Sequence, residues 1–368
     1  MITAFATSPK SVAALNYYPN YQITKQTYDS YAKTLNEYAI NPCDIYSNLE
    51  NNIPIKHWSK YIKEGANAIC LGTIPIIHPD SIILRNKFKK ILQLKIDSLK
   101  SFHLYKYAYL YGFDEIEKTE TIFLKNMIQL VREVDKIIPI SCTTVKPNKN
   151  LINITDITIQ NIDNYSSKLK SKKKEKNWWY ACGSTKSESI SNFNTDYSAI
   201  SPRILFWKTN SQDITGFLYF STVFWNNNTY NENMLSQYKE VSIKQNPNEK
   251  ELREGKRWPN IPWLTYSFYN FNGDGQLFYP GKNQNELWPS IRLINTRDGI
   301  EDYEIATEIK KINLSNSTKK RYEQKIKWLI RFKKLLISKR LDKTKPIELI
   351  KLKKEALIIL SSNNKFKL

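Results

Sequence analysis

Residues 107–115 read YAYLYGFDE, and this run is the strongest strand signal in the chain. Seven aromatic, apolar or glycine residues precede the two acids, which is typical of a strand buried on both faces. The stretch that follows has one apolar face at helical spacing, formed by Leu124, Met127, Val131 and Val134. A buried strand followed by an amphipathic helix is the repeating unit of a parallel sheet.

The same alternation extends in both directions from this unit. Strands are predicted over 4–7, 44–46, 67–71, 139–145, 156–160, 177–182 and 216–220, the second of them weak. Helices are predicted from about Thr24, over 57–65, over 81–102 and over 202–213. We therefore count seven or eight strands, most of them followed by a helix.

Repeated strand–helix alternation predicts an α/β fold with a parallel sheet, and eight such units close into a (β/α)8 TIM-type barrel. A doubly wound open sheet is the alternative. That fold usually has a glycine-rich phosphate turn after its first strand, and the chain, with only 10 glycines, has none there. We predict a barrel over 1–310 and a Lys-rich helical extension over 311–368 that packs on it. An Asn-rich stretch over 226–250 is predicted to be a long loop over the barrel mouth.

The net charge of +21 over 368 residues raises the question of a polyanionic partner. The basic residues are mostly Lys, and they are scattered rather than interleaved with aromatics on one element. The run from Lys168 to Lys176 is interpreted as a solvated insertion. Nucleic acid is therefore a disfavoured partner, and polyanion binding is kept as a minor alternative.

Residues typical of metal, cofactor or disulfide sites are few. The four cysteines form no CxxC pair and are predicted to be buried free thiols: Cys43, Cys70, Cys142 and Cys182. The three histidines lie outside any recognisable catalytic turn, so we expect no metal site and no cofactor. No apolar run of 18 residues is present, and Met1–Phe5 lacks the features of a signal peptide. We expect a soluble protein of unknown compartment.

The two acids at the end of the central strand, Asp114-Glu115, are the candidate catalytic pair. The carboxyl ends of barrel strands build the active site, because side chains there converge over the mouth. Adjacent residues of a regular strand point to opposite faces, but beyond the strand end both can reach one substrate. The alternative is that these acids only cap the helix that follows.

Paired carboxyl groups favour glycoside hydrolysis, which needs one protonated acid and one ionised partner. Because the two residues are contiguous, the second cannot sit across the sugar as a nucleophile. The chemistry that fits is substrate-assisted: the 2-acetamido oxygen of the sugar attacks the anomeric carbon. One carboxylate holds the acetamido N–H, and the other carboxyl group protonates the leaving oxygen.

Several strings of the chain resemble glycoside hydrolase family 123, the β-N-acetylgalactosaminidase family. The most specific of these strings begin at Gly273-Asp274-Gly275 and extend to Tyr279-Pro280-Gly281. They continue with Pro289-Ser290-Ile291-Arg292-Leu293 and Arg297-Asp298-Gly299-Ile300-Glu301-Asp302-Tyr303-Glu304. Supporting matches are 111–115, Trp178-Trp179-Tyr180, Gly216-Phe217-Leu218-Tyr219 and Trp225. Members of that family commonly carry an N-terminal β-sandwich domain, whereas this chain starts almost directly at the predicted barrel.

The resemblance implies a (β/α)8 barrel and a retaining β-N-acetylhexosaminidase. It assigns Asp114 to orient the acetamido group and Glu115 to act as general acid and base, through an oxazolinium intermediate. The substrate would be a glycan or glycoconjugate with a terminal β-linked N-acetylgalactosamine or N-acetylglucosamine. The main alternative is a catalytically silent sugar-binding barrel.

Further substrate-binding residues are predicted at the ends of strands, where side chains face the mouth. They are Tyr111, Asp163, Asn164, Tyr180, Tyr219, Trp225 and Asn226; for several of them, ordinary packing or solvation is an equal alternative. The charged cluster over 297–302 is interpreted as structural, because it is predicted to open a helix.

Overall fold

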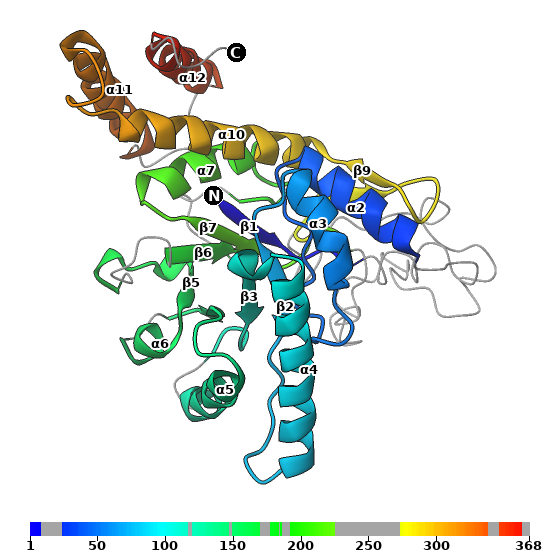
Figure 1. The fold of residues 1–368 in the computed structure, drawn as a ribbon. Coiled ribbons are helices and arrows are strands. Elements are labelled where there is room, and N and C mark those ends of the chain that lie inside the picture. The colour runs from blue at the N-terminus through cyan, green and yellow to red at the C-terminus, as the bar shows by residue number, and fades with distance from the viewer. Residues whose placement is uncertain are drawn as a thin grey trace, which may run out of the picture.

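The structure is a computed structural model, and it describes residues 1–8, 24–116, 120–146, 149–169, 177–183, 185, 192–224, 273–337 and 346–362. Within these ranges, seven parallel strands form a nearly closed barrel with helices around the outside (Figure 1). The strands are β1 (Ile2–Phe5), β2 (Ile69–Thr73), β3 (Ala108–Tyr111), β4 (Ile140–Thr144), β5 (Ile157–Asn161), β6 (Asn177–Ala181) and β7 (Gly216–Tyr219). The predicted (β/α)8-type barrel is confirmed.

The order of the strands around the barrel is β1-β7-β6-β5-β4-β3-β2. Residues 40–48 fill the gap between β2 and β1 as an irregular segment. The Thr7 N–H donates to the Cys43 carbonyl at 2.8 Å on one side, and the Thr73 N–H donates to the Ser47 carbonyl at 2.8 Å on the other. The predicted strand over 44–46 is thus wrong as a regular strand, although the segment occupies the eighth strand position.

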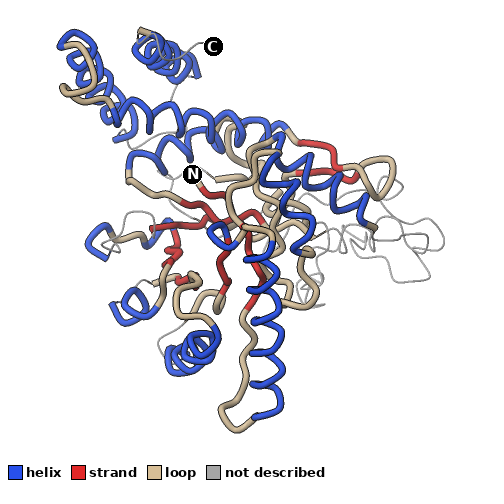
Figure 2. Tube along the Cα trace, in the orientation of Figure 1, coloured by secondary structure: helices blue, strands red, loops and turns tan. Residues whose placement is uncertain are grey.

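Around the strands, which are red in Figure 2, lie the helices, which are blue. They are α2 (Lys25–Glu37), α3 (Ile55–Lys63), α4 (Ile82–Ser101), α5 (Thr121–Val134), α6 (Lys149–Ile154), α7 (Ser201–Ser211), α10 (Ile291–Lys311), α11 (Lys319–Ile337) and α12 (Pro346–Ser361). Short 3₁₀ turns cover 105–107, 162–164 and 167–169, and an antiparallel hairpin joins β8 (Phe278–Pro280) to β9 (Leu287–Pro289). Helix α6 was not predicted, because six residues are too few to show a helical period.

Helix α10 begins earlier than predicted. Its N-cap is Ser290, whose hydroxyl accepts the Leu293 N–H, so the charged cluster over 297–302 lies inside the helix. The prediction that this cluster opens a helix is therefore wrong. Its structural role stands on other contacts: Asp302 is buried and accepts hydrogen bonds from Arg203 at 2.5 Å and from Trp207 at 2.7 Å.

Alternate residues of the strands fill the barrel interior and the outer shell. Trp178, Tyr180 and Leu218 pack inside the barrel, whereas Trp179 and Phe217 pack outward against α7 and α10. This alternation is the period of two that any strand imposes. A Cβ on Gly216 would overlap the indole of Trp178, so a glycine is needed where the ring crosses β7.

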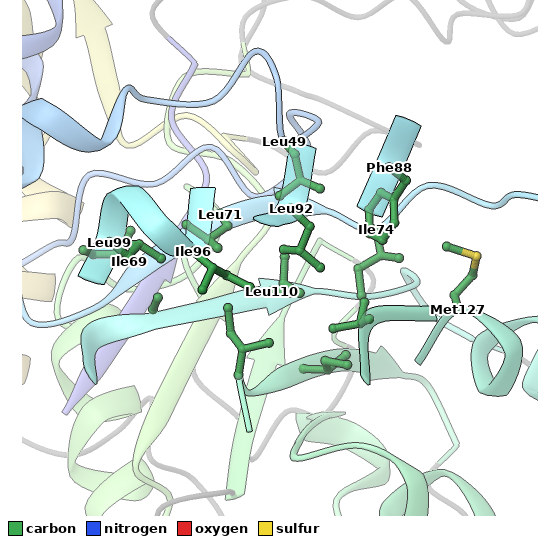
Figure 3. Packing of buried hydrophobic residues seen from close by; sticks show 14 of the residues in the cluster. Leu49, Ile69, Leu71, Ile74, Phe88, Leu92, Ile96, Leu99, Leu110 and Met127 are labelled. Carbon is green, nitrogen blue, oxygen red and sulfur yellow. The ribbon is translucent and has the colours of Figure 1, made fainter. Parts of the chain in front are cut away.

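A second apolar core lies between the strands and α3, α4 and α5 (Figure 3). Helix α4 contributes Phe88, Leu92, Ile96 and Leu99, which recur every three or four residues. That spacing places them on one face of the helix, and the long helix is held by burial of this face. Leu94 lies on the other face and is 61% exposed.

The two C-terminal helices pack on α7 and α10. Trp328 and Phe332 of α11 stack at 5.0 Å and join a buried cluster with Trp207. Lys353 of α12 reaches the buried carboxylate of Asp302 at 3.1 Å. These contacts agree with a helical extension that packs on the barrel, while its predicted boundary at residue 310 stays a prediction.

Three cysteines are buried and free, and Cys182 is free and half-buried. In the part of the chain that the structure describes, no helix is long and apolar enough to cross a membrane. The predicted loop over 226–250 lies outside the described residues, as does most of the run from Lys168 to Lys176.

Two leucines of α4 provide a matched test of this packing. Leu92→Ala is expected to lower the free energy of unfolding by about 2–5 kcal/mol, because it leaves a cavity in a close-packed core. Leu94→Ala, on the exposed face of the same helix, is expected to change it by less than about 0.5 kcal/mol. Urea unfolding of both variants measures the difference, and equal destabilisation would contradict the described face of α4.

Candidate active site

The carboxylate pair lies in a short loop that leaves the end of β3 and docks on β4. The Gly112 N–H donates to the Ser141 carbonyl at 2.6 Å, and the Ile116 N–H donates to the Thr143 carbonyl at 3.1 Å. A Cβ on Gly112 would lie 2.7 Å from the Ser141 oxygen and would overlap the Cys142 sulfur. The glycine therefore lets the loop approach β4 closely and sets where the two acids lie.

Asp114 is held through one of its two carboxylate oxygens. Its Oδ1 accepts a hydrogen bond from the Tyr111 hydroxyl at 2.6 Å and another from the Thr143 hydroxyl at 2.7 Å. Among the described residues, Oδ2 has no hydrogen-bond partner. The side chain is thus oriented by the protein and has one oxygen available to a ligand.

Glu115 is held in a similar way from the other side of the barrel. Its Oε1 accepts a hydrogen bond from the Tyr180 hydroxyl at 2.6 Å, and its N–H donates to the Thr143 hydroxyl at 2.6 Å. The backbone of Glu115 has φ +44°, a region that non-glycine residues rarely adopt and that often marks functional sites. The regular alternation of side chains is broken here, as the prediction required.

The two tyrosines stay protonated and can only donate to the carboxylates. Burial, together with the negative charge of Asp114, raises the pKa of the Tyr111 hydroxyl well above its ordinary value. Burial, followed by the hydrogen bond to Glu115, raises the pKa of Tyr180 in the same direction. Each carboxyl group is therefore oriented by a hydroxyl that donates to it.

The carboxylate pair is accessible to solvent. Both carboxylates are exposed at the end of the barrel, and neither has a Lys or Arg partner among the described residues. Within those ranges, no three His, Cys, Asp or Glu side chains gather in a way that could hold a metal ion. Two oriented carboxyl groups, each with a free oxygen, can hold an N–H group and exchange a proton with a bound substrate.

Among the described residues, the structure brings Tyr111 and Tyr180 to the pair, but not Asp163, Asn164 or Tyr219. Asp163 and Asn164 are exposed in the 3₁₀ turn after β5, with no described contact to either carboxylate. Tyr219 is buried outside the barrel, where its hydroxyl donates to Asp274 at 2.8 Å. Trp225 and Asn226 lie outside the described residues.

Two residues of the site were missed in the sequence. Thr143 contacts both members of the pair, and the side chain of Asn161 contacts the Tyr180 hydroxyl. Each lies at or next to the end of a predicted strand, as Asp114 and Glu115 do. That position was the available signal, but threonine and asparagine are too common in this chain to stand out.

The glycine-rich string over 273–275 is a structural brace near the site. Asp274 is buried and accepts hydrogen bonds from Tyr219 and from the Gly183 N–H, the latter at 2.8 Å. Arg292 is also buried, and it donates to the carbonyls of Phe193, Gly273 and Gln276. These contacts fasten the segment after β6, which carries Tyr180, to the start of α10.

A (β/α)8-type barrel with a pair of oriented carboxylates at the carboxyl ends of its strands has them where barrel enzymes place their active sites. The family model of the catalytic domain of glycoside hydrolase 123 matches residues 28–309. The chain therefore belongs to glycoside hydrolase family 123. It is a glycoside hydrolase with a glycan substrate.

Comparison with solved structures agrees with this fold. A family 123 glycoside hydrolase from Clostridium perfringens, whose structural analysis addressed glycolipid glycan hydrolysis, superposes with a TM-score of 0.59 at 14% identity. The match covers 99% of this chain and 69% of that one. An FMN-binding β-glucuronidase from Facaelibacterium prausnitzii L2-6 matches with a TM-score of only 0.35 at 12% identity, over 60% of this chain and 37% of that one. No curated protein sequence matches the chain.

Substitution of Thr143 tests how the loop is held. Thr143→Val keeps the shape but removes the acceptor for the Glu115 N–H and a donor to Asp114, so amide exchange over 112–116 is expected to become faster. Thr158→Val is the control, because the Thr158 hydroxyl contacts Thr155 and lies outside the loop. Hydrogen–deuterium exchange with peptide resolution measures both variants. Unchanged exchange over 112–116 in Thr143→Val would contradict the bridging role.

Proposed function

We propose that this enzyme is a retaining glycoside hydrolase that removes terminal β-linked N-acetylgalactosamine, or N-acetylglucosamine, by substrate-assisted catalysis. The observation that carries the proposal is the contiguous pair Asp114-Glu115, in which one oxygen of each carboxylate accepts no hydrogen bond from the described residues. The family resemblance favours N-acetylgalactosamine. The activity of the clostridial relative on glycolipid glycans is in keeping with a terminal-sugar substrate.

The first half of the reaction forms the cyclic intermediate. The free Oδ2 of Asp114 accepts the acetamido N–H and turns the acetamido carbonyl oxygen towards the anomeric carbon. That oxygen forms a bond to the anomeric carbon as the glycosidic bond breaks. Glu115, in its protonated form, gives its proton to the leaving oxygen. The product on the enzyme is an oxazolinium ion, whose positive charge the Asp114 carboxylate stabilises.

The second half releases the sugar. Glu115, now ionised, removes a proton from a water molecule, and the water oxygen attacks the anomeric carbon as the bond to the acetamido oxygen breaks. Two inversions at the same carbon give net retention of configuration. Glu115 recovers its proton in this step and is ready for another turnover.

The position of the pair supports this route over direct nucleophilic attack. Retaining enzymes with a protein nucleophile place two carboxyl groups about 5–5.5 Å apart on opposite sides of the sugar. Here the acids are neighbours in one loop, where the Thr143 hydroxyl donates to the Asp114 carboxylate and accepts the backbone N–H of Glu115. An N-acetylated substrate supplies the nucleophile that the protein lacks on the opposite side.

Hydrolysis of p-nitrophenyl β-glycosides of N-acetylgalactosamine, N-acetylglucosamine and galactose tests the proposal. We expect release from an N-acetylated sugar only. Glu115→Gln and Asp114→Asn are each expected to lower kcat by at least about a hundredfold, as loss of a general acid or an orienting charge does. Glu133→Gln, which removes an exposed surface ion pair with Lys89, is the control and should retain full activity.

Three outcomes would contradict the proposal. Equal hydrolysis of the galactoside would exclude participation of the acetamido group. Full activity of either pair variant would exclude its assigned role. Inverted configuration of the first-formed sugar, followed by NMR, would exclude the oxazolinium route.

A further inference from the structure

Tyr46 lies at the seam where the barrel closes, in a turn whose backbone is well fixed. The Asn52 amide donates to the Asp44 carbonyl at 2.9 Å, and the Thr73 hydroxyl donates to the Ile45 carbonyl at 2.9 Å. Ile45, on one side of Tyr46, is fully buried inside the barrel. The turn therefore presents Tyr46 at a defined place on the rim.

The ring of Tyr46 packs against the machinery of the site. It meets the Tyr111 ring edge to face, with centroids 5.9 Å apart, and Tyr111 is the residue that donates to Asp114. Yet the two rings differ in access to solvent: Tyr46 is 44% exposed, whereas Tyr111 is fully buried. Of these two rings, only that of Tyr46 is therefore accessible to a ligand.

The charges of the carboxylate pair act on the Tyr46 hydroxyl. Desolvation by its surroundings, followed by the negative charges of Asp114 and Glu115, raises the pKa of Tyr46 well above its ordinary value. The Tyr46 ring also packs against Tyr111, which donates to Asp114, so the residue lies beside the pair. The hydroxyl keeps its proton and is a donor.

That donor is not used within the described part of the chain. The hydroxyls of Tyr111 and Tyr180 each donate to a carboxylate of the pair, but the Tyr46 hydroxyl has no hydrogen-bond partner there. A polar group partly withdrawn from water loses free energy unless it finds a partner. A fixed, protonated hydroxyl beside two acids is therefore poised for an oxygen of a bound molecule.

We propose that Tyr46 is a substrate-binding residue, whose hydroxyl donates a hydrogen bond to an oxygen of the sugar held by Asp114 and Glu115. Its ring forms the wall of that subsite on the closing seam, next to Tyr111. The inference rests on the proposed function for the identity of the sugar. It adds a contact from the eighth strand position, whereas Tyr180, the partner of Glu115, contributes from β6.

Tyr46→Phe separates this role from simple packing, because it keeps the ring against Tyr111 and removes only the hydroxyl. We expect kcat/KM for the preferred p-nitrophenyl glycoside to fall about five- to tenfold, the effect of one lost hydrogen bond to a neutral partner. The unfolding midpoint should be unchanged. Tyr105→Phe is the control: it removes, in the turn before β3 and at the opposite end of that strand from the pair, a hydroxyl bonded to Asp135, and should leave kcat/KM unchanged.

A binding measurement makes this test independent of turnover. In the Glu115→Gln background, calorimetric affinity for the same glycoside should fall by a similar factor on Tyr46→Phe. Unchanged kcat/KM and affinity in an active enzyme would overturn the role of Tyr46 and leave the proposed function intact. Tyr46-dependent binding without hydrolysis by the wild type would overturn the proposed function and keep Tyr46. Absence of both binding and hydrolysis for all N-acetylated glycosides would overturn both.

Discussion

Closure of the sheet is the constraint on which the rest of the molecule depends. A parallel sheet left open exposes unpaired N–H and C=O groups at both edges, and closing it removes them. The seven strands of this barrel leave one gap, and residues 40–48 bridge it with hydrogen bonds to Thr7 and Thr73. An irregular segment is sufficient there, because only backbone groups must be matched. The side chains of that segment need not follow the regular alternation of a strand.

The site inherits its geometry from the closed barrel. Tyr111 and Tyr180 pack inside it, on β3 and β6, and each hydroxyl reaches a different member of the carboxylate pair. Two rigid donors on separate strands therefore fix two neighbouring side chains that would otherwise diverge. The positive φ of Glu115 completes this arrangement, because it turns the backbone so that both acids meet donors from the barrel. The same tyrosines thus pack the barrel interior and orient the proposed catalytic pair.

Much of this was predictable from sequence, for identifiable reasons. Buried strands and amphipathic helices leave strong periodic signals, so the barrel and the strand that carries Asp114-Glu115 could be recognised. Four features could not be recognised in the same way: the seam at 44–46, the start of α10, and the places of Thr143 and Tyr219. Each depends on which distant backbone or side chain lies opposite. Tyr219 and Tyr180 both lie near the end of a strand. Tyr219 nevertheless points outward, because Tyr180 pairs with Leu218 and Tyr219 is one residue out of phase with the interior.

The outward orientation of Tyr219 also explains how the string over 273–304, which carries the family resemblance, can support the site without contacting the carboxylates. Tyr219 points outward to Asp274, and Asp274 also takes the Gly183 N–H just after β6. The string therefore acts on the site through the segment that follows Tyr180, not through the substrate. Its buried Arg292 and Asp302 hold α10 to the barrel by hydrogen bonds whose geometry tolerates few other residues. Such a brace supports the position of Tyr180, and hence of Glu115, and it leaves Tyr46 exposed on the rim.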